Sequence, residues 1–168
     1  QGYSSAASDV YKRQIGDSFY LSKVATKVSQ DRIIFAGVEF MGESAKILNP
    51  KKRVFMPDMN ADCPMAHMAD KDEILALREK YDDLAVVCYI NSTAELKKYS
   101  DVCVTSSNAV KIVKNLPNKN IFFIPDRNLG SYVAKQCPDK NFIFNNGCCP
   151  RHVVITKDMV LKLSLIHI

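Results

Sequence analysis

The stretches that decide how this chain folds are Arg53-Val54-Phe55-Met56-Pro57-Asp58-Met59-Asn60 and Ile121-Phe122-Phe123-Ile124-Pro125-Asp126-Arg127-Asn128. Each is an apolar run of strand type that leads into Pro-Asp-x-Asn. Self-similarity of this kind along a chain indicates a duplicated structural unit. We therefore expect two related units, each of which places a strand end and a short polar loop at an equivalent position.

Strand-like and helix-like segments alternate around this repeat. Apolar strands are expected at 32–36, 54–56, 84–90, 102–105, 121–124 and 142–144, and helices at 39–48, 71–81, 93–99, 108–116 and 130–136. Continuous apolar strands that alternate with helices predict parallel sheets covered by helices. The expected fold class is therefore α/β, built as repeated three-layer αβα units with short parallel sheets. The expected units are 15–82, shortened at its N-terminal end, and 83–162.

The two ends of the chain differ from its interior. Residues 1–14 contain no apolar segment of the kind a signal peptide needs, and residues 163–168 stop without a helix cap or a loop. Both segments resemble translated sequencing-adapter read-through. We therefore leave them out of the expected fold and treat the remainder as an interior fragment.

Composition narrows the possible partners and the compartment. No apolar run approaches the ~18 residues of a membrane span, so no membrane partner is expected. The formal charge of +5 is scattered along helical stretches and is not interleaved with aromatic residues, so no nucleic-acid partner is expected either. The six cysteines show no disulfide-framework spacing, which indicates a reducing compartment and a cytoplasmic location.

Polar residues gather where the predicted strands end, and ligands of parallel sheets bind at those carboxyl ends. The set comprises Gly37, Asp58, Asn60, Tyr89, Asn91, 105–108, Asp126, Asn128 and 146–149. Two of these segments, 91–93 and 105–108, also begin predicted helices with hydroxyl and amide side chains. Each could be a plain helix cap, but two such starts at one rim favour a site for a carboxylate or phosphate.

Cys63 and Cys149 occupy similar places, each shortly after the strand that closes its unit. This equivalence makes them candidate ligands of an iron–sulfur cluster. The alternative for any single cysteine is a small buried hydrophobe, and we interpret Cys88 and Cys103 in that way because they lie inside apolar strands. A zinc or redox protein would favour a Cys-x-x-Cys pair, and the sequence contains none.

Seven segments in order resemble the quinolinate synthase family, from residue 15 to about 160. They are 16–18, 40–48, 63–66, 89–95, 105–109, 125–130 and 147–152. The resemblance implies a fold of three similar pseudo-symmetric α/β domains around a central cavity, of which the duplicated units match two. The family's early histidine and tyrosine motif and its third domain, with the third cysteine, have no counterpart in this sequence.

The resemblance also implies a function. It implies an enzyme of NAD biosynthesis that condenses iminoaspartate with dihydroxyacetone phosphate to quinolinate, with loss of phosphate and water. L-Aspartate oxidase or aspartate dehydrogenase would supply the iminoaspartate. A four-iron four-sulfur cluster held by three cysteines would keep one iron open as a Lewis acid. With two of the three cysteines, the fragment is expected to be inactive and to bind the cluster weakly.

Residue by residue, the resemblance implies Cys63 and Cys149 as metal ligands. Cys149 is preferred over Cys148 because the family pattern of glycine, one residue, cysteine, two residues and histidine fits Gly147, Cys149 and His152. His152 would contact the substrate or orient the cluster loop, with a surface histidine as the alternative.

The same resemblance places Ser18, Tyr89, Asn91 and Ser106 on the substrate. Tyr89 would be catalytic, as a proton donor, and the alternative for it is a tyrosine bonded to the backbone. His67 has no matched role and is expected on the surface. The competing function is a non-catalytic α/β module that binds a phosphorylated or dicarboxylate small molecule.

Overall fold

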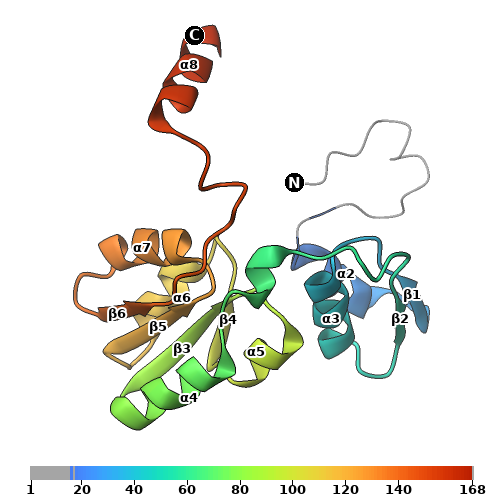
Figure 1. Cartoon of the computed structure of the whole chain (residues 1–168). Helices are drawn as coiled ribbons and strands as arrows, with labels where there is room; N and C mark the ends of the chain where they lie inside the picture. Colours follow the sequence, from blue (N-terminus) through green and yellow to red (C-terminus); the bar gives the residue numbers. More distant parts are fainter. Residues whose placement is uncertain (1–15, 17, 168) are drawn as a thin grey trace.

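The computed structural model describes residue 16 and residues 18–167, so the segment 1–14 lies outside the described residues. Helices and strands alternate along the chain (Figure 1). In order they are α2 (Tyr20–Lys27), β1 (Arg32–Ile34), α3 (Glu39–Leu48), β2 (Arg53–Phe55), the 3-10 helix η1 (Pro64–His67), α4 (Lys71–Lys80), β3 (Leu84–Tyr89), α5 (Ala94–Lys98), β4 (Val102–Val104), α6 (Ala109–Asn115), β5 (Asn120–Ile124), α7 (Arg127–Gln136), β6 (Asn141–Phe144) and α8 (Lys157–His167).

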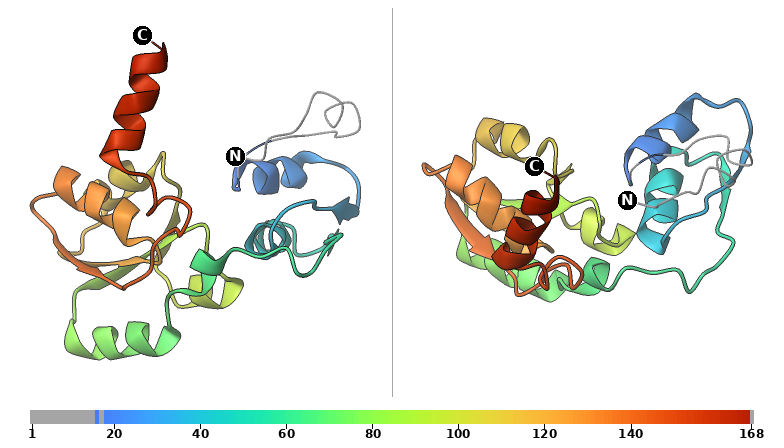
Figure 2. Two further views of the ribbon diagram at one scale, coloured as in Figure 1. Left: turned by 45° about the horizontal axis from the view of Figure 1, so that its top comes forward. Right: turned by 90° about the horizontal axis from the view of Figure 1, so that it is seen from above.

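The strands form two parallel sheets, which confirms the predicted α/β class. β1 pairs with β2, and the larger sheet has the order β4-β3-β5-β6. The views in Figure 2 show the smaller unit, with α2 and α3, beside the larger one. Parallel strands need helical crossovers, and the helices that connect these strands provide them.

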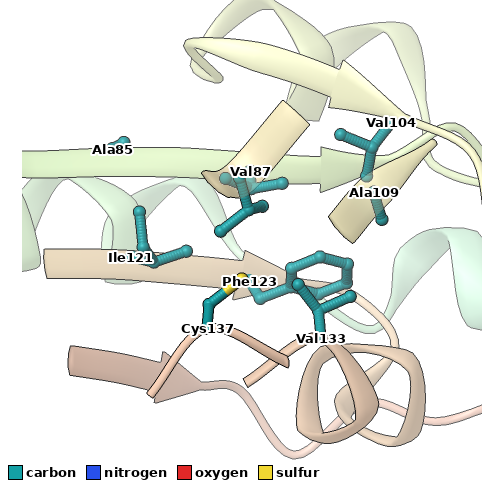
Figure 3. Close-up of a cluster of buried hydrophobic side chains, with 9 residues drawn as sticks. Ala85, Val87, Val104, Ala109, Ile121, Phe123, Val133 and Cys137 are labelled. Carbon is teal, nitrogen blue, oxygen red and sulfur yellow. The ribbon is translucent and has the colours of Figure 1, made fainter. Parts of the chain in front are cut away.

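The larger sheet is covered on both faces, because its central strands β3 and β5 are apolar at successive positions. On one face Val87 and Phe123 pack with α6 and α7, through residues such as Val113 and Val133 (Figure 3). On the other face Phe122 and its neighbours pack against Ile74 of α4 and Leu96 of α5. This arrangement is the expected three-layer unit.

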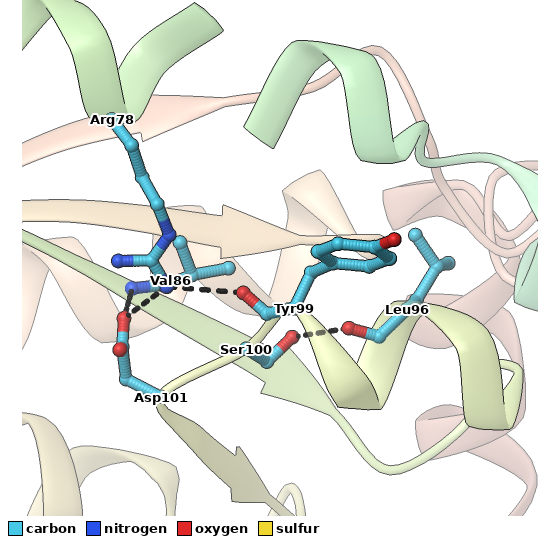
Figure 4. Close-up of polar contacts among 6 residues, drawn as sticks. All are labelled: Arg78, Val86, Leu96, Tyr99, Ser100 and Asp101. Atoms are coloured by element: carbon cyan, nitrogen blue, oxygen red, sulfur yellow. Dashed lines mark hydrogen bonds and ion pairs between the residues drawn. The ribbon is translucent and has the colours of Figure 1, made fainter. Parts of the chain in front are cut away.

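Asp101, the residue immediately before β4, binds the neighbouring strand β3 through its side chain. Its Oδ2 accepts a hydrogen bond from the Val86 backbone N–H at 2.7 Å and another from Arg78 Nη2 at 2.9 Å (Figure 4). The β3–β4 ladder begins one residue further along, where Val87 pairs with Val102. The carboxylate therefore satisfies a strand donor that the short neighbouring strand leaves open.

In the smaller unit, α3 lies close to the segment after β2. The Met56 sulfur lies so near Gly42 of α3 that a larger residue at this position would make the Met56 side chain move. Phe40 and Ala45 of α3 are buried, and Lys52 Nζ donates to the backbone oxygens of Ala25 and Val28 after α2. These contacts hold the helices on the two-stranded sheet.

Most predicted elements are present, with differences at their ends. α7 begins at Arg127 and not at residue 130, because the buried Asp126 accepts hydrogen bonds from the backbone N–H groups of Asn128 and Leu129. Three elements were not predicted: α2, η1 and α8. α8 continues through the position where the expected boundary at residue 163 lies. α4 falls in the expected unit 15–82 but covers the larger sheet.

α8 stands clear of the sheets in Figures 1 and 2. Its side chains from 157 to 163 are exposed. None of the helices between residues 18 and 167 combines the length and the apolar character that a membrane crossing requires.

Candidate functional site

A small polar pocket lies at the carboxyl ends of β3 and β4. It has a volume of about 50 Å³ and is lined by Ser18, Phe19, Tyr89, Ile90, Thr105 and Ser106. The resemblance places four residues on the substrate, and the pocket brings three of them together: Ser18, Tyr89 and Ser106. Phe19 was not expected there, although its position beside Ser18 in the sequence is a signal that points to it.

The parallel register explains why these residues meet. Tyr89 is the last residue of β3 and pairs with Val104, the last residue of β4. The Ile90 N–H continues the ladder by donating to the Val104 oxygen at 2.8 Å. The loops after the two strands therefore leave the sheet together, and the turn that carries Ser18, just before α2, completes the pocket.

The turn after β3 is held by Ser92, which is fully buried. Its Oγ donates to the Tyr89 oxygen at 2.6 Å, and its N–H donates to the Ile90 oxygen at 2.9 Å. Asn91 lies within this turn, and its Oδ1 is buried without a hydrogen-bond partner among the described residues. An unsatisfied buried acceptor is costly, so it marks a place where a ligand N–H or O–H would be stabilising.

At the helix start at 91–93, a carboxylate of the protein itself, that of Glu43, binds a backbone N–H group. Glu43 of α3 reaches across to accept a hydrogen bond from the Ala94 N–H at 2.7 Å, while Thr93 Oγ1 accepts one from the Leu96 N–H at 3.3 Å. These two groups cap α5, so two of the N–H groups at this helix start are bonded within the protein.

The second helix start keeps its hydroxyls near the pocket. Asn108 Oδ1 accepts a hydrogen bond from the Thr105 N–H at 2.7 Å, and the hydroxyls of Thr105 and Ser107 lie 2.9 Å apart. Ser106, between them, is exposed and lines the pocket. This loop is therefore ordered by its own side chains and leaves Ser106 available to a ligand.

Lys97, one residue before the C-terminal end of α5, also joins the two units. Its Nζ donates to Ser44 Oγ at 2.9 Å and lies 5.7 Å from the centre of the Phe40 ring, both on α3. Burial lowers the pKa of Lys97, and the thiols of Cys88 and Cys103 and the carboxylate of Glu43 oppose this effect. α3 and α5 thus place the Ser18 side of the pocket against the Tyr89 side.

The two predicted cluster cysteines lie near two segments that contact each other, the segment after η1 and the loop after β6. Cys63 immediately precedes η1, and Cys149 follows β6. Asn145 Nδ2 donates to the Met68 oxygen at 2.6 Å, and a Cβ on Gly147 would collide with the Pro125 oxygen and press on Met68. The loop after β6 therefore fits closely against the segment after η1.

The donor set of these loops fits the implied cluster. Cys63, Cys148 and Cys149 are free thiols and partly exposed, so the first and either of the others could be reached by a metal group. Thiolates are the usual ligands of iron–sulfur clusters. The described residues therefore include thiols whose chemistry suits such a cluster.

Neither histidine of interest lines the pocket. His152 is exposed. Its backbone N–H donates to the Cys149 backbone oxygen at 3.1 Å, which keeps the residue in the turn after the cysteines. His67 is on the surface, as expected, with Nε2 2.8 Å from Asp62 Oδ2. A larger hollow of about 410 Å³ lies between Glu43, the segment 67–71 and α5, and none of the predicted site residues lines it.

The fold and the pocket together define a class: an α/β protein of parallel-sheet units with a polar pocket at the strand ends. The sequence model of the family described as "Quinolinate synthetase A protein" matches residues 3–167. The chain belongs to the quinolinate synthase family.

Individual relatives agree with this assignment. The chain is 62% identical over 150 residues to a quinolinate synthase of Fusobacterium nucleatum, which covers 89% of the chain and 50% of that protein. It is 54% identical over 153 residues to one of Caldicellulosiruptor saccharolyticus, covering 91% and 50% respectively. It is 52% identical over 150 residues to one of Clostridioides difficile, covering 89% and 49%. The chain spans about half the length of these curated relatives.

Proposed function

We propose that this chain is part of an enzyme that forms quinolinate from iminoaspartate and dihydroxyacetone phosphate, with loss of phosphate and water, in NAD biosynthesis. The family membership carries the proposal. The pocket supports it, because Ser18, Tyr89 and Ser106 come from three separate segments of the chain and line one cavity. The supplier of iminoaspartate would be L-aspartate oxidase or aspartate dehydrogenase, and the location cytoplasmic.

The side chains suggest how the work is divided. Among the described residues that line the pocket, Tyr89 carries an acidic hydroxyl, which would donate a proton to the condensing substrate. Ser18 and Ser106 would bind carboxylate or phosphate oxygens by hydroxyl donation. Asn91 Oδ1 suits an N–H or O–H of the substrate, and rotation of its amide would present Nδ2 to a carboxylate.

Cys63 and Cys149 would hold a four-iron four-sulfur cluster together with a third thiolate from outside this chain. When bound, such a cluster supplies a Lewis acid that favours loss of water from the substrate. The loop contact through Asn145 would keep the two cysteine loops at a fixed separation. His152 would orient the loop of Cys149 or contact substrate.

The test uses the longer polypeptide of which this chain forms part, purified without oxygen. We expect Tyr89→Phe to lower the rate of quinolinate formation by roughly 10²–10⁴-fold, because proton transfer contributes about that much. Tyr132→Phe is the matched control, since Tyr132 is exposed on α7 and should retain full activity. Quinolinate is measured chromatographically at saturating substrate.

Iron and sulfide content tests the ligands in the same preparations. Cys63→Ala and Cys149→Ala should lose the cluster, whereas Cys148→Ala should retain it. Retention of iron by Cys149→Ala and its loss in Cys148→Ala would exchange the two assignments. A wild type that contains no iron, forms no quinolinate and yet binds a phosphorylated acid would favour the non-catalytic binding module.

A further inference from the structure

Cys88 and Cys103 lie side by side on neighbouring strands, and the proposed reaction uses neither. They are register partners in the parallel β3–β4 ladder. Register partners project from the same face of a sheet, so the two thiols share the face that α4 and α5 cover. Adjacent strands are about 4.8 Å apart, which lies within the range of Cα separations that a disulfide accepts.

The surroundings of the pair favour an ionised sulfur. Cys88 Sγ lies 3.1 Å from Ser92 Oγ. The hydrogen bond with the Cys103 thiol lowers the pKa of Cys88 to about 7 against the effect of burial, with Ser92, Ser100 and Lys97 adding to it. The same shared bond, together with burial, raises the pKa of Cys103. The shared hydrogen bond thus favours the ionised form of one thiol of the pair and the protonated form of the other, and a thiolate is the reactive form of cysteine.

An oxidant can reach this pair from one side. Cys88 is completely buried, whereas Cys103 is exposed on β4, which is an edge strand of the larger sheet. Cys137 is also completely buried, but it lies at the C-terminal end of α7 and in none of the described strands, and burial raises its pKa. It is therefore a buried thiol, away from this strand pair, that serves for comparison.

We propose that Cys88 and Cys103 form a reversible thiol–disulfide site that is oxidised by peroxides. The proposal does not rest on the quinolinate reaction. A thiolate of the pair attacks the peroxide, so an S–O bond forms, the O–O bond breaks and one water leaves after protonation. The second sulfur then attacks the sulfenic acid, forming S–S and releasing a second water. Two thiols are oxidised by two electrons and hydrogen peroxide is reduced by two.

Oxidation of the pair would change the contacts of Ser92, which holds the turn next to the pocket. The new bond would replace the contact of Cys88 Sγ with Ser92 Oγ, and Ser92 also holds the Tyr89 oxygen. The site therefore links the oxidation state of the β3–β4 edge to the turn that carries Tyr89 and Asn91.

The sequence makes this site easy to test, because trypsin separates the cysteines. Cys88 falls on peptide 81–97, Cys103 on 99–111 and Cys137 on 136–140. The reduced chain is treated with a small excess of hydrogen peroxide, alkylated, and its monomer digested for mass spectrometry. We expect a linked 81–97/99–111 peptide, two hydrogens lighter than the sum of its parts, which disappears when dithiothreitol is added before alkylation.

Cys103→Ser and Cys88→Ser are the variants, each checked for an unchanged far-ultraviolet circular dichroism spectrum. Neither should give a linked peptide, and peptide 136–140 should stay alkylated throughout. Should the variants not fold, the wild-type comparison of peptide 99–111 with 136–140 still decides. Peptides 81–97 and 99–111 that remain reduced, that are oxidised singly without linking, or that link no more often than 136–140 would overturn the proposal.

Discussion

Cys88 is a completely buried thiol, yet its polar neighbours lower its pKa. Burial by itself would raise its pKa, so the lowering to about 7 comes from polar neighbours, first the Cys103 thiol and then Ser92, Ser100 and Lys97. Because the folded-state pKa lies below the ordinary value of 9.0, the folded state binds fewer protons between these values. The stability that the thiolate contributes is therefore complete above pH 9.0 and is lost as the pH falls through about 7.

A thiolate titration tests this assignment. The ultraviolet thiolate absorbance of the wild type minus that of Cys88→Ala should rise with a midpoint near pH 7. The same difference measured in a Cys103→Ala background should have a higher midpoint, because the largest cause of the lowered pKa is then gone. A midpoint at the ordinary value of 9.0 in both backgrounds would contradict the role of Cys103.

Single residues also show what sequence reading could and could not reach. The strand ends that carry Tyr89 and Ser106 were predictable, because parallel strands bring their carboxyl ends to one edge. Cys88 and Cys103 were interpreted as small hydrophobes, since an apolar run does not reveal which residues of two strands are partners. Asp126 was assigned to the polar rim, but its carboxylate caps α7, a local signal that was present in the sequence.

At the scale of elements, the short strand β4 is defined by Asp101 more than by apolar residues. β4 has three residues, and Asp101 immediately before it accepts the Val86 N–H and the Arg78 side chain. The Arg78–Asp101 ion pair is substantially exposed and should contribute little. We therefore expect Asp101 to stabilise the fold mainly through its hydrogen bond with the Val86 N–H of β3.

We expect Asp101→Ala to lower the free energy of unfolding by about 1–2 kcal/mol, because the Val86 N–H loses its acceptor. Asp101→Asn should cost less, since an amide oxygen can still accept that bond. Urea unfolding followed by circular dichroism measures both. Arg78→Ala is the control that removes the ion pair and the hydrogen bond of Arg78 to the Tyr99 oxygen but keeps the acceptor of the Val86 N–H. A loss for it as large as that of Asp101→Ala would assign the effect to the Arg78 contacts.

Helices were predicted well where their apolar spacing is regular, as in α3, and less well where tertiary contacts decide. α2 was not predicted, although its buried Ser22 and Ala25 face the smaller unit. α5 has only five residues, too few for stable helix formation by itself. Its N-terminus depends on Glu43, which lies 51 residues away in the sequence. No local pattern could indicate that partner.

For the whole molecule, the contact between the two units depends on a few polar groups of α3. Glu43 accepts the Ala94 N–H, and Ser44 accepts Lys97 Nζ, whose pKa is lowered by burial. Both contacts join α3 of the smaller unit to α5 of the larger one. The pocket that they share thus requires the units to keep their relative placement.

Glu43→Ala should loosen this placement. The Ala94 N–H would lose the carboxylate that accepts its hydrogen bond, and a partly buried donor without an acceptor costs about 1–3 kcal/mol. We expect calorimetry to show a lower melting temperature and a broader transition, as the smaller unit begins to unfold before the larger one. Glu43→Gln keeps an acceptor oxygen and should lose less. Glu79→Ala, an exposed change on α4, should leave the transition unchanged. If Glu43→Ala melts in the same single sharp transition as the wild type, the carboxylate does not couple the units, and Lys97 with Phe40 must hold them together.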